Sequence, residues 1–141
     1  MKILALDIGD AWTGSALSDL SGMFARPYRT VPSDQLKTFL TEIFSAESIS
    51  KIVVGYPRTM RGTASEQTKK IESIKQELEK EYSDKQWILW DERLSSKRAA
   101  QQSKKMLSKE EKIKSHSIAA AFILESYLTF VHQFATPEDE Q

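Results

Sequence analysis

Acidic side chains follow two short apolar runs that lie far apart in the chain. Asp7 follows the run at residues 2–6, and Asp91 and Glu92 follow the run at residues 87–90. In open α/β sheets, ligands bind beyond the carboxyl ends of the strands, where the strand order reverses. Carboxylates held close together there repel one another, so they keep a proton or bind a hard divalent cation. Mg²⁺ or Mn²⁺ suits such a site, and a pair of ions can hold both the attacking and the leaving oxygen of a phosphodiester.

A second interpretation of these acidic residues is structural. Strands often end in acidic residues simply because they end at the protein surface. The spacing of Asp7, Asp91 and Glu92 slightly favours this explanation, and an Asp-x-Gly sequence such as residues 7–9 is a weak signal by itself. The carboxylates gain a joint role only if the first and last strands lie near each other in one sheet.

Five short apolar runs predict the strands that would carry these side chains. They are bounded by Gly, Pro, Asp or Ser residues, and several are rich in β-branched residues. The runs lie at residues 2–6, 15–18, 26–31, 52–54 and 87–90. The short connections between the first three predict an antiparallel meander, whereas the last two alternate with helices and must therefore pair in parallel.

Apolar residues at helical spacing predict four helices between and after the strands. Ser33 is the expected N-cap of the first helix and Ser95 that of the third. The last helix is apolar nearly all round, which is typical of a deeply buried helix. The segments are about 33–44, 71–82, 95–106 and 117–134, with a flexible basic loop at 109–114. The sequence therefore predicts an α/β fold with a five-stranded mixed sheet and helices on both faces.

Length and composition restrict the class of protein. The chain has 141 residues, with 20 Lys and Arg against 20 Asp and Glu, and it has no Cys. That length predicts a single domain at residues 1–134, followed by an acidic, flexible tail at 135–141. The lack of Cys excludes disulfides, a thiol nucleophile and Cys-ligated zinc. The first apolar run is too short for a signal peptide and no run could span a membrane, so we expect a cytoplasmic protein with no membrane partner.

Positive charge is concentrated between Arg93 and His116. This segment holds eight basic and two acidic residues, although the whole chain is neutral. Nucleic-acid binding depends on where charge lies rather than on its total, so neutrality does not exclude it. Taken alone, a lysine-rich segment is more simply explained as a solvated helix face.

Three segments together resemble the YqgF family of ribonuclease H-like nucleases, whose members are named pre-16S rRNA nucleases and, earlier, Holliday-junction resolvases. The first is LALDIGDAWTGSALSD at residues 4–19, with its Asp-x-Gly opening and small-residue strand. The second is IVVGYPRTMRGTAS at 52–65, which is similar to the family's Gly-x-Pro loop. The third is DERLSS at 91–96, close to the family's Asp-Glu-Arg-Leu pattern, and AAAFILESYL fits its last helix. The motif order is kept over almost the whole chain.

The resemblance implies a ribonuclease H-like fold and an acidic triad that binds Mg²⁺ or Mn²⁺. Carried over by position, the first carboxylate is Asp7 and the second is Glu92. The third family acid lies in a Lys-Val-Asp-Ser context at the start of the last helix. Here that context is KSHS at residues 114–117, so His116 stands where the family has Asp.

Two interpretations of His116 remain open. A neutral imidazole binds Mn²⁺ and softer ions better than Mg²⁺, and related ribonuclease H-like resolvases accept His at the corresponding place. Alternatively, His116 is an ordinary polar residue of a first helical turn, and catalysis is weakened or lost. The opening motif departs from the family as well, because Asp10 follows the Gly. Asp10 could add a carboxylate to the metal site, although a plain turn residue is the simpler interpretation.

Once carboxylates and a metal are assumed, the basic side chains gain a role in neutralising substrate phosphates. Such contacts position a nucleic-acid backbone without reading its sequence. Arg93 could hold a phosphate, orient Glu92 or form a structural ion pair. The predicted substrate-binding residues are Arg58, Arg61, Arg93, Lys97, Arg98 and Lys114, with Lys104, Lys105 and Lys112 beside them.

We therefore expect a metal-dependent nuclease in which Asp7, Glu92 and His116 are catalytic and bind the metal. The expected substrate, structured RNA at the 5′ end of pre-16S rRNA, comes from the resemblance alone, and a DNA junction is the alternative. A second hypothesis is a catalytically silent RNA-binding assembly factor. A third is nucleotide binding, because DIG resembles the phosphate loop of actin-like ATPases, but those proteins are far longer. A monomer and a weak dimer both remain open.

Overall fold

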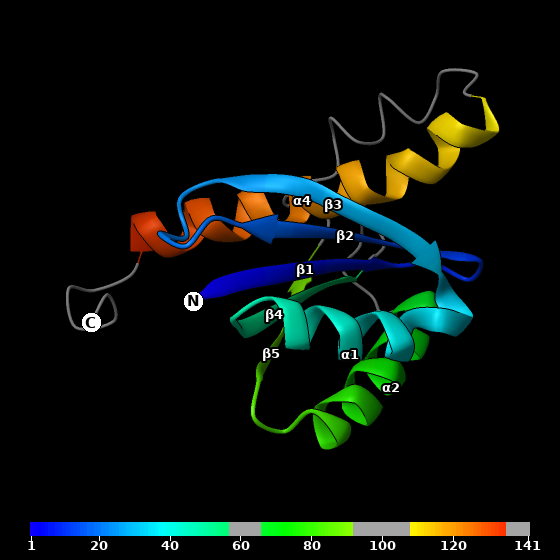
Figure 1. Ribbon diagram of the computed structural model, residues 1–141, viewed down its shortest axis with the longest axis horizontal. Helices are drawn as coiled ribbons and strands as arrows, with labels where there is room; N and C mark the ends of the chain where they lie inside the picture. Colours follow the sequence, from blue (N-terminus) through cyan, green and yellow to red (C-terminus); the bar gives the residue numbers. More distant parts are fainter. Residues whose placement is uncertain (57–65, 92–107, 135–141) are drawn as a thin grey trace.

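The computed structural model describes residues 1–56, 66–91 and 108–134, which form one sheet with helices on both faces (Figure 1). The strands are β1 (Lys2–Ile8), β2 (Trp12–Ser18), β3 (Ala25–Pro32), β4 (Ile49–Tyr56) and β5 (Gln86–Asp91). The helices are the 3₁₀ turn η1 (Ser33–Gln35), α1 (Leu36–Ala46), α2 (Glu66–Glu81) and α4 (Lys109–Phe134). The predicted helix at 95–106 and the predicted tail at 135–141 lie outside the described residues.

The sheet has the order β3-β2-β1-β4-β5. β1, β2 and β3 pair antiparallel, whereas β4 pairs in parallel with both β1 and β5. β2 and β3 are thus added on one side of β1, and β4 and β5 are added on its other side. The predicted meander and mixed sheet are confirmed, and the point where the strand order reverses lies between β1 and β4.

The face beneath α1 and α2 carries the larger apolar cluster. Leu4, Leu6 and Ile8 alternate along β1 toward it, and the helices add the residues that repeat at helical spacing. The helical members are Leu36, Phe39, Leu40, Ile43, Ile71 and Leu78, with Ile74 and Tyr82 packed at the margin. These are the residues that the sequence pattern predicts for the buried sides of the first two helices.

The opposite face carries α4 and smaller residues. Ala5, Ala16 and Val53 of the sheet pack against Ala120, Ile123, Leu124, Tyr127 and Leu128 of the helix. Glu125, Thr129 and Phe130 of α4 are exposed, so this helix is buried on one side rather than all round as predicted. None of the helices in the described part of the chain combines the length and the apolar character needed to cross a membrane.

The predicted loop at residues 109–114 is wrong, because α4 begins at Lys109. Ser108 is the N-cap: its Oγ accepts the Glu111 N–H at 3.2 Å and donates to Glu111 Oε1 at 3.1 Å. This Ser-x-x-Glu capping box starts a helix in a stretch that lacks apolar periodicity. His116 is consequently the eighth residue of α4, about two turns in, rather than a residue of the first turn.

The predicted N-cap role of Ser33 is also wrong. The chain passes from Pro32 into η1 without a side-chain cap, and α1 begins only at Leu36. The Ser33 hydroxyl instead donates to the Gly9 carbonyl at 2.6 Å and lies 2.9 Å from Thr13 Oγ1. Ser33 therefore fastens the loop after β1 to the start of α1.

Candidate active site at the carboxyl end of β1

Asp7 is the next-to-last residue of β1 and points to the face covered by α4. Its neighbours Leu6 and Ile8 belong to the cluster beneath α1 and α2, and side chains alternate along a strand. Asp7 therefore shares its face with Ala5, which packs against α4. The Asp7 side chain keeps 21% of its surface exposed, so it is accessible to a ligand.

Gly14 brings α4 onto the sheet beside Asp7. It pairs directly with Asp7 across β1 and β2. A Cβ atom at Gly14 would lie 2.0 Å from the carbonyl oxygen of His116 and 2.5 Å from the nitrogen of Ser117. Only glycine fits this contact, because any other residue would overlap the helix backbone. The contact places His116 over the end of β1.

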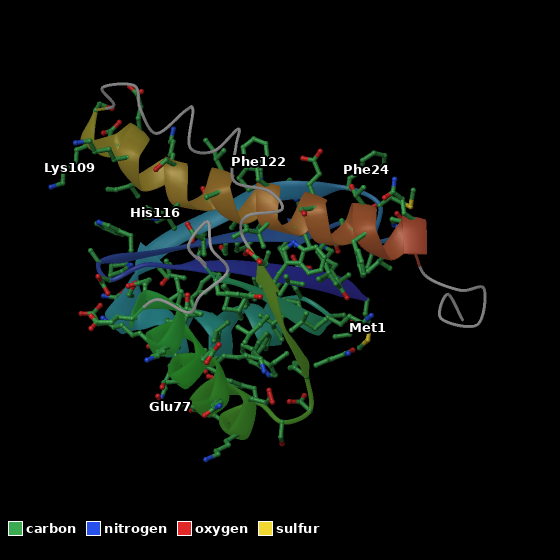
Figure 2. All side chains as sticks on the ribbon, turned by 180° about the vertical axis from the view of Figure 1, so that it is seen from behind. Met1, Phe24, Glu77, Lys109, His116 and Phe122 are labelled. Atoms are coloured by element: carbon green, nitrogen blue, oxygen red, sulfur yellow. The ribbon has the colours of Figure 1, made fainter. Side chains whose placement is uncertain are left out.

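Asp7 and His116 face each other across this contact. His116 Nδ1 lies 3.7 Å from Asp7 Oδ2, and the imidazole keeps 34% of its surface exposed. Figure 2 shows His116 between Lys109 and Phe122 along α4. Gly9 also borders the imidazole, since a Cβ there would lie 3.7 Å from His116 Cε1 and 2.7 Å from the Trp12 carbonyl oxygen. Asp7 and His116 lie on separate elements far apart in the sequence, and the close contact of α4 with Gly14 brings them together.

The separation of the two side chains is compatible with a shared divalent ion. Oxygen and nitrogen ligands lie about 2.1 Å from such ions, so two ligands of one ion can be up to about 4.2 Å apart. The 3.7 Å between Nδ1 and Oδ2 is within that limit but too long for a hydrogen bond. Two ligands do not complete a site, and the part of the chain that is described has no group of three or more His, Cys, Asp or Glu that could hold a metal.

Glu92, the predicted second carboxylate, lies outside the described residues. The neighbouring Asp91 ends β5 and pairs with Tyr56 of β4. The first and last strands were predicted to lie near each other. In the sheet, β1 and β5 are not adjacent but are separated by one strand, β4. On β4, the residue that pairs with Trp90 of β5 is Gly55, which has no side chain.

Asp10 is directed away from this pair. Its Oδ1 lies 2.6 Å from Lys70 Nζ of α2, and both side chains are largely exposed. Because α2 covers the face opposite to α4, this ion pair favours the interpretation of Asp10 as a loop residue over that of a further metal ligand.

Lys114 is the one predicted substrate-binding residue within the described ranges. It is exposed on α4, two residues before His116, and Lys109 and Lys112 are exposed on the same end of the helix. This end of the helix, which also carries the exposed Glu110 and Glu111, extends beyond the sheet on the side of the β1–β2 connection (Figure 1). The other predicted residues, Arg58, Arg61, Arg93, Lys97 and Arg98, lie outside the described residues, as do Lys104 and Lys105.

Sequence reasoning missed the positioning role of Gly14. The signal was present, because a glycine inside a strand often marks a close backbone approach. The Ser-x-x-Glu sequence at residues 108–111 is a second missed signal, since it starts the helix that carries His116.

Comparisons with known proteins identify the family of this chain. A family described as "RuvX: Holliday junction resolvase" matches residues 1–129. A protein from Clostridium tetani is 37% identical, covering 94% of this chain and 99% of its own length. A protein from Rubrobacter xylanophilus is 30% identical over 90% and 91% of the two chains. Both carry the name "Putative pre-16S rRNA nuclease".

Solved structures resemble this chain in fold. RuvC of T. thermophilus in complex with a Holliday junction substrate superposes with a TM-score of 0.63 at 12% identity, covering 95% of this chain and 97% of RuvC. A second Thermus thermophilus RuvC structure gives 0.60 at 12% identity, with coverage of 94% and 96%. The predicted ribonuclease H-like fold is thereby confirmed. With the family match across residues 1–129 and these relatives over most of their length, the chain belongs to the RuvX family of ribonuclease H-like nucleases.

Proposed function

We propose that this protein is a metal-dependent nuclease that hydrolyses a phosphodiester bond in structured RNA, at the 5′ end of pre-16S rRNA in the cytoplasm. The observation that carries the proposal is the approach of His116 to Asp7 at the carboxyl end of β1. The choice of RNA follows the names of the relatives from Clostridium tetani and Rubrobacter xylanophilus.

Glu92 is the proposed second carboxylate, and the pattern along β5 supports it. Ile88 and Trp90 pack on the face beneath α4, whereas Trp87 and Leu89 pack on the opposite face. Asp91 follows Trp90 at the end of β5, so it belongs to the opposite face from the one that carries Asp7. Gly55 of β4, which pairs with Trp90, places no side chain between β1 and β5. The face of Asp91, together with the family motif at residues 91–94, favours Glu92 over Asp91 as the residue that shares an ion with Asp7.

Asp7, Glu92 and His116 would hold Mg²⁺ or Mn²⁺. Such an ion would supply Lewis-acid chemistry for attack of water on a phosphodiester. Asp7 would contribute a carboxylate oxygen from the end of a buried strand, and His116 a ring nitrogen whose position is set by the helix contact at Gly14. Lys112 and Lys114, exposed near His116 on α4, would neutralise substrate phosphates.

The test is cleavage of two substrates by the wild type and Asp7→Asn. A structured RNA that contains the 5′ end of pre-16S rRNA and a four-way DNA junction are incubated with Mg²⁺ or Mn²⁺. We expect Asp7→Asn to lower the rate by about 100-fold or more, as for loss of a group that stabilises charge in the transition state. Asp10→Asn is the matched control, because Asp10 is paired with Lys70, and should leave the rate unchanged. Equal rates for Asp7→Asn and wild type would refute the mechanism.

His116→Asp tests the metal preference. An imidazole ligand suits Mn²⁺ better than Mg²⁺, so the wild type should be more active with Mn²⁺ and the variant should shift toward Mg²⁺. Salt-sensitive RNA binding without cleavage under either ion, together with no gain from His116→Asp, would favour an RNA-binding assembly factor instead.

Junction cleavage is the second candidate activity. The solved RuvC structure that resembles this fold holds a Holliday junction, and the family description names a Holliday junction resolvase. Faster cleavage of the DNA junction than of the RNA would assign that substrate class to this chain, with the same catalytic residues.

A further inference from the structure

A β-bulge interrupts the pairing of β2 with β3. Gly14 pairs with Thr30 and Ala16 pairs with Pro27, so Ser15 alone lies opposite both Tyr28 and Arg29. The Ser15 hydroxyl donates to the Arg29 carbonyl at 2.5 Å and accepts the Arg29 N–H at 3.1 Å. This buried side chain satisfies the backbone of the extra residue, so the bulge is held in a defined geometry.

The bulge places two consecutive side chains on one face. Gly14 and Ala16 face α4, so their partners Thr30 and Pro27 face α4 as well. Tyr28 and Arg29 lie between those partners and therefore share the opposite face, whereas a regular strand would separate them. As a result, the Arg29 guanidinium lies over the Tyr28 ring, 5.5 Å from its centroid. The ring centroid in turn lies 6.2 Å from that of Phe39 on α1.

This pair is exposed and positively charged. Tyr28 keeps 36% of its surface exposed, and Arg26 and Arg29 are both exposed. Within the described ranges neither arginine forms an ion pair with an acidic side chain. β3 is an edge strand, and Pro27 removes one N–H from that edge, which disfavours addition of a further strand.

We propose that Arg29, held over Tyr28 at the bulge, is a stacking platform for an unpaired base of single-stranded RNA. Unpaired bases stack on aromatic rings and on arginine guanidinium planes, and basic side chains neutralise the adjoining phosphates. Tyr28 is a positioning residue, because it orients the guanidinium by a cation–π contact. The identity of the ligand as RNA rests on the proposed function, whereas the platform itself rests on the bulge.

The platform and the candidate active site lie on opposite faces of the sheet. Asp7, Gly14 and Thr30 are in register on three adjacent strands, so Thr30 is two strand spacings, about 10 Å, from Asp7. Arg29 is the next residue of β3, but its side chain lies on the face beneath α1, whereas Asp7 lies on the face covered by α4. An RNA that contacts both would therefore need a single-stranded flank that passes around the edge of the sheet.

The test is fluorescence anisotropy of a labelled single-stranded RNA and of a blunt RNA duplex of the same sequence, with the full chain and without divalent ions. Arg29→Lys keeps the charge but removes the planar guanidinium. We expect about fivefold or greater weakening for the single strand, the effect of losing one base stack, and no change for the duplex. Arg26→Lys is the matched control and should change neither affinity by more than about twofold.

Tyr28 variants test the positioning role. Tyr28→Phe keeps the ring and should bind like the wild type, whereas Tyr28→Leu should reproduce the loss seen in Arg29→Lys. If Tyr28→Leu does not fold, the comparison of Arg29→Lys with Arg26→Lys still decides. Unchanged single-strand affinity in Arg29→Lys, or an equal loss for single strand and duplex, would overturn the proposal. Binding of a poly-glutamate peptide that depends on Arg29 while RNA binding does not would assign the surface to an acidic protein segment and would also overturn it.

The two proposals fail separately. Loss of single-strand affinity in Arg29→Lys supports the platform even if Asp7→Asn cleaves like the wild type. Conversely, if Arg29→Lys binds RNA normally, the proposed nuclease function still stands provided that cleavage depends on Asp7.

Discussion

The two faces of the sheet are filled in different ways. Beneath α1 and α2, β1 and β2 contribute Leu4, Leu6, Ile8 and Leu17, and these large side chains hold the helices away from the strand backbone. Beneath α4, the same strands contribute Ala5, Gly14 and Ala16, and the helix backbone reaches the sheet. More apolar surface is therefore buried on the face beneath α1 and α2, whereas the face beneath α4 allows a helix to lie closer to the strands.

This difference separates stability from chemistry. Burial of large apolar side chains supplies most of the favourable free energy of folding. The close approach of α4 to the sheet instead fixes the positions of side chains. Asp7 and His116 face each other on the side of the sheet where this approach occurs. We infer that substitutions on the two faces should be separable by experiment, with stability affected on one and activity on the other.

Leu6→Ala is expected to have the largest effect on stability. Leu6 is fully buried in the cluster beneath α1 and α2, and its truncation should lower the free energy of unfolding by about 2 to 5 kcal/mol. Urea unfolding measures the loss. Leu20→Ala, at a side chain that is 69% exposed, is the control and should change stability by less than about 0.5 kcal/mol. A tenfold loss of cleavage per folded molecule in Leu6→Ala would show that the faces are coupled.

Gly14→Ala should instead displace the active site. Its Cβ would overlap the His116 backbone, so α4 must shift, at a cost of about 1 to 3 kcal/mol. Cleavage should fall by about 100-fold, because His116 no longer meets Asp7. Gly22→Ala is the matched control: Gly22 has a φ of +71° with open space around it, so alanine there costs about 1 to 2 kcal/mol of backbone strain and leaves cleavage intact. Wild-type cleavage by Gly14→Ala would refute the positioning role.

Much of the fold could be predicted because its patterns are local. The alternation in β1 and the helical spacing of Leu36, Leu40 and Ile43 are visible in the sequence, and short connections predict the meander. The beginning of α4 escaped this approach because Lys109–Lys114 have no apolar stripe, and the helix there depends on the Ser108 capping box. Capping is a local signal, but it concerns a few atoms rather than a repeating pattern.

The site was only partly predictable because its geometry depends on packing between distant segments. Asp7 was identified from the end of a strand and from the family motif, and His116 from its position in the KSHS segment. Their 3.7 Å separation depends on Gly14, and the stacking of Arg29 on Tyr28 depends on the pairing register at Ser15. Neither a helix contact nor a register shift can be read from one segment alone. Glu92 remains a prediction.

Ser108→Ala should have a moderate effect, confined to the α4 side. Loss of the N-cap should lower the free energy of unfolding by about 1 kcal/mol and loosen the turn that precedes Lys112 and Lys114. Circular dichroism and urea unfolding measure the change, and nucleic-acid affinity should weaken slightly while Asp7 and His116 stay together. Ser73→Ala, at an exposed position inside α2, is the control and should be neutral or slightly stabilising. An equal loss in both variants would contradict the capping role.

Asp19→Asn should have the smallest effect, at the end of the sheet away from the active site. The Ser21 hydroxyl, with the backbone N–H groups of Phe24 and Met23, lowers the pKa of Asp19 from 3.8 to about 2. Because the folded pKa lies below the unfolded one, the charged carboxylate stabilises the protein above about pH 4, and this contribution disappears as the pH falls through about 2.

Thermal unfolding at a series of pH values checks this expectation. The Tm of Asp19→Asn should lie slightly below that of the wild type at pH 7, and the gap should close between pH 4 and pH 2. The gap should also shrink at high salt, since the carboxylate lies at the protein surface. Asp34→Asn is the control for loss of one surface charge. Asp19 lies in the connection between β2 and β3, at the end of the sheet away from Asp7, so cleavage at pH 7 should not change. A Tm gap that widens on acidification, or a loss of cleavage, would contradict the assignment.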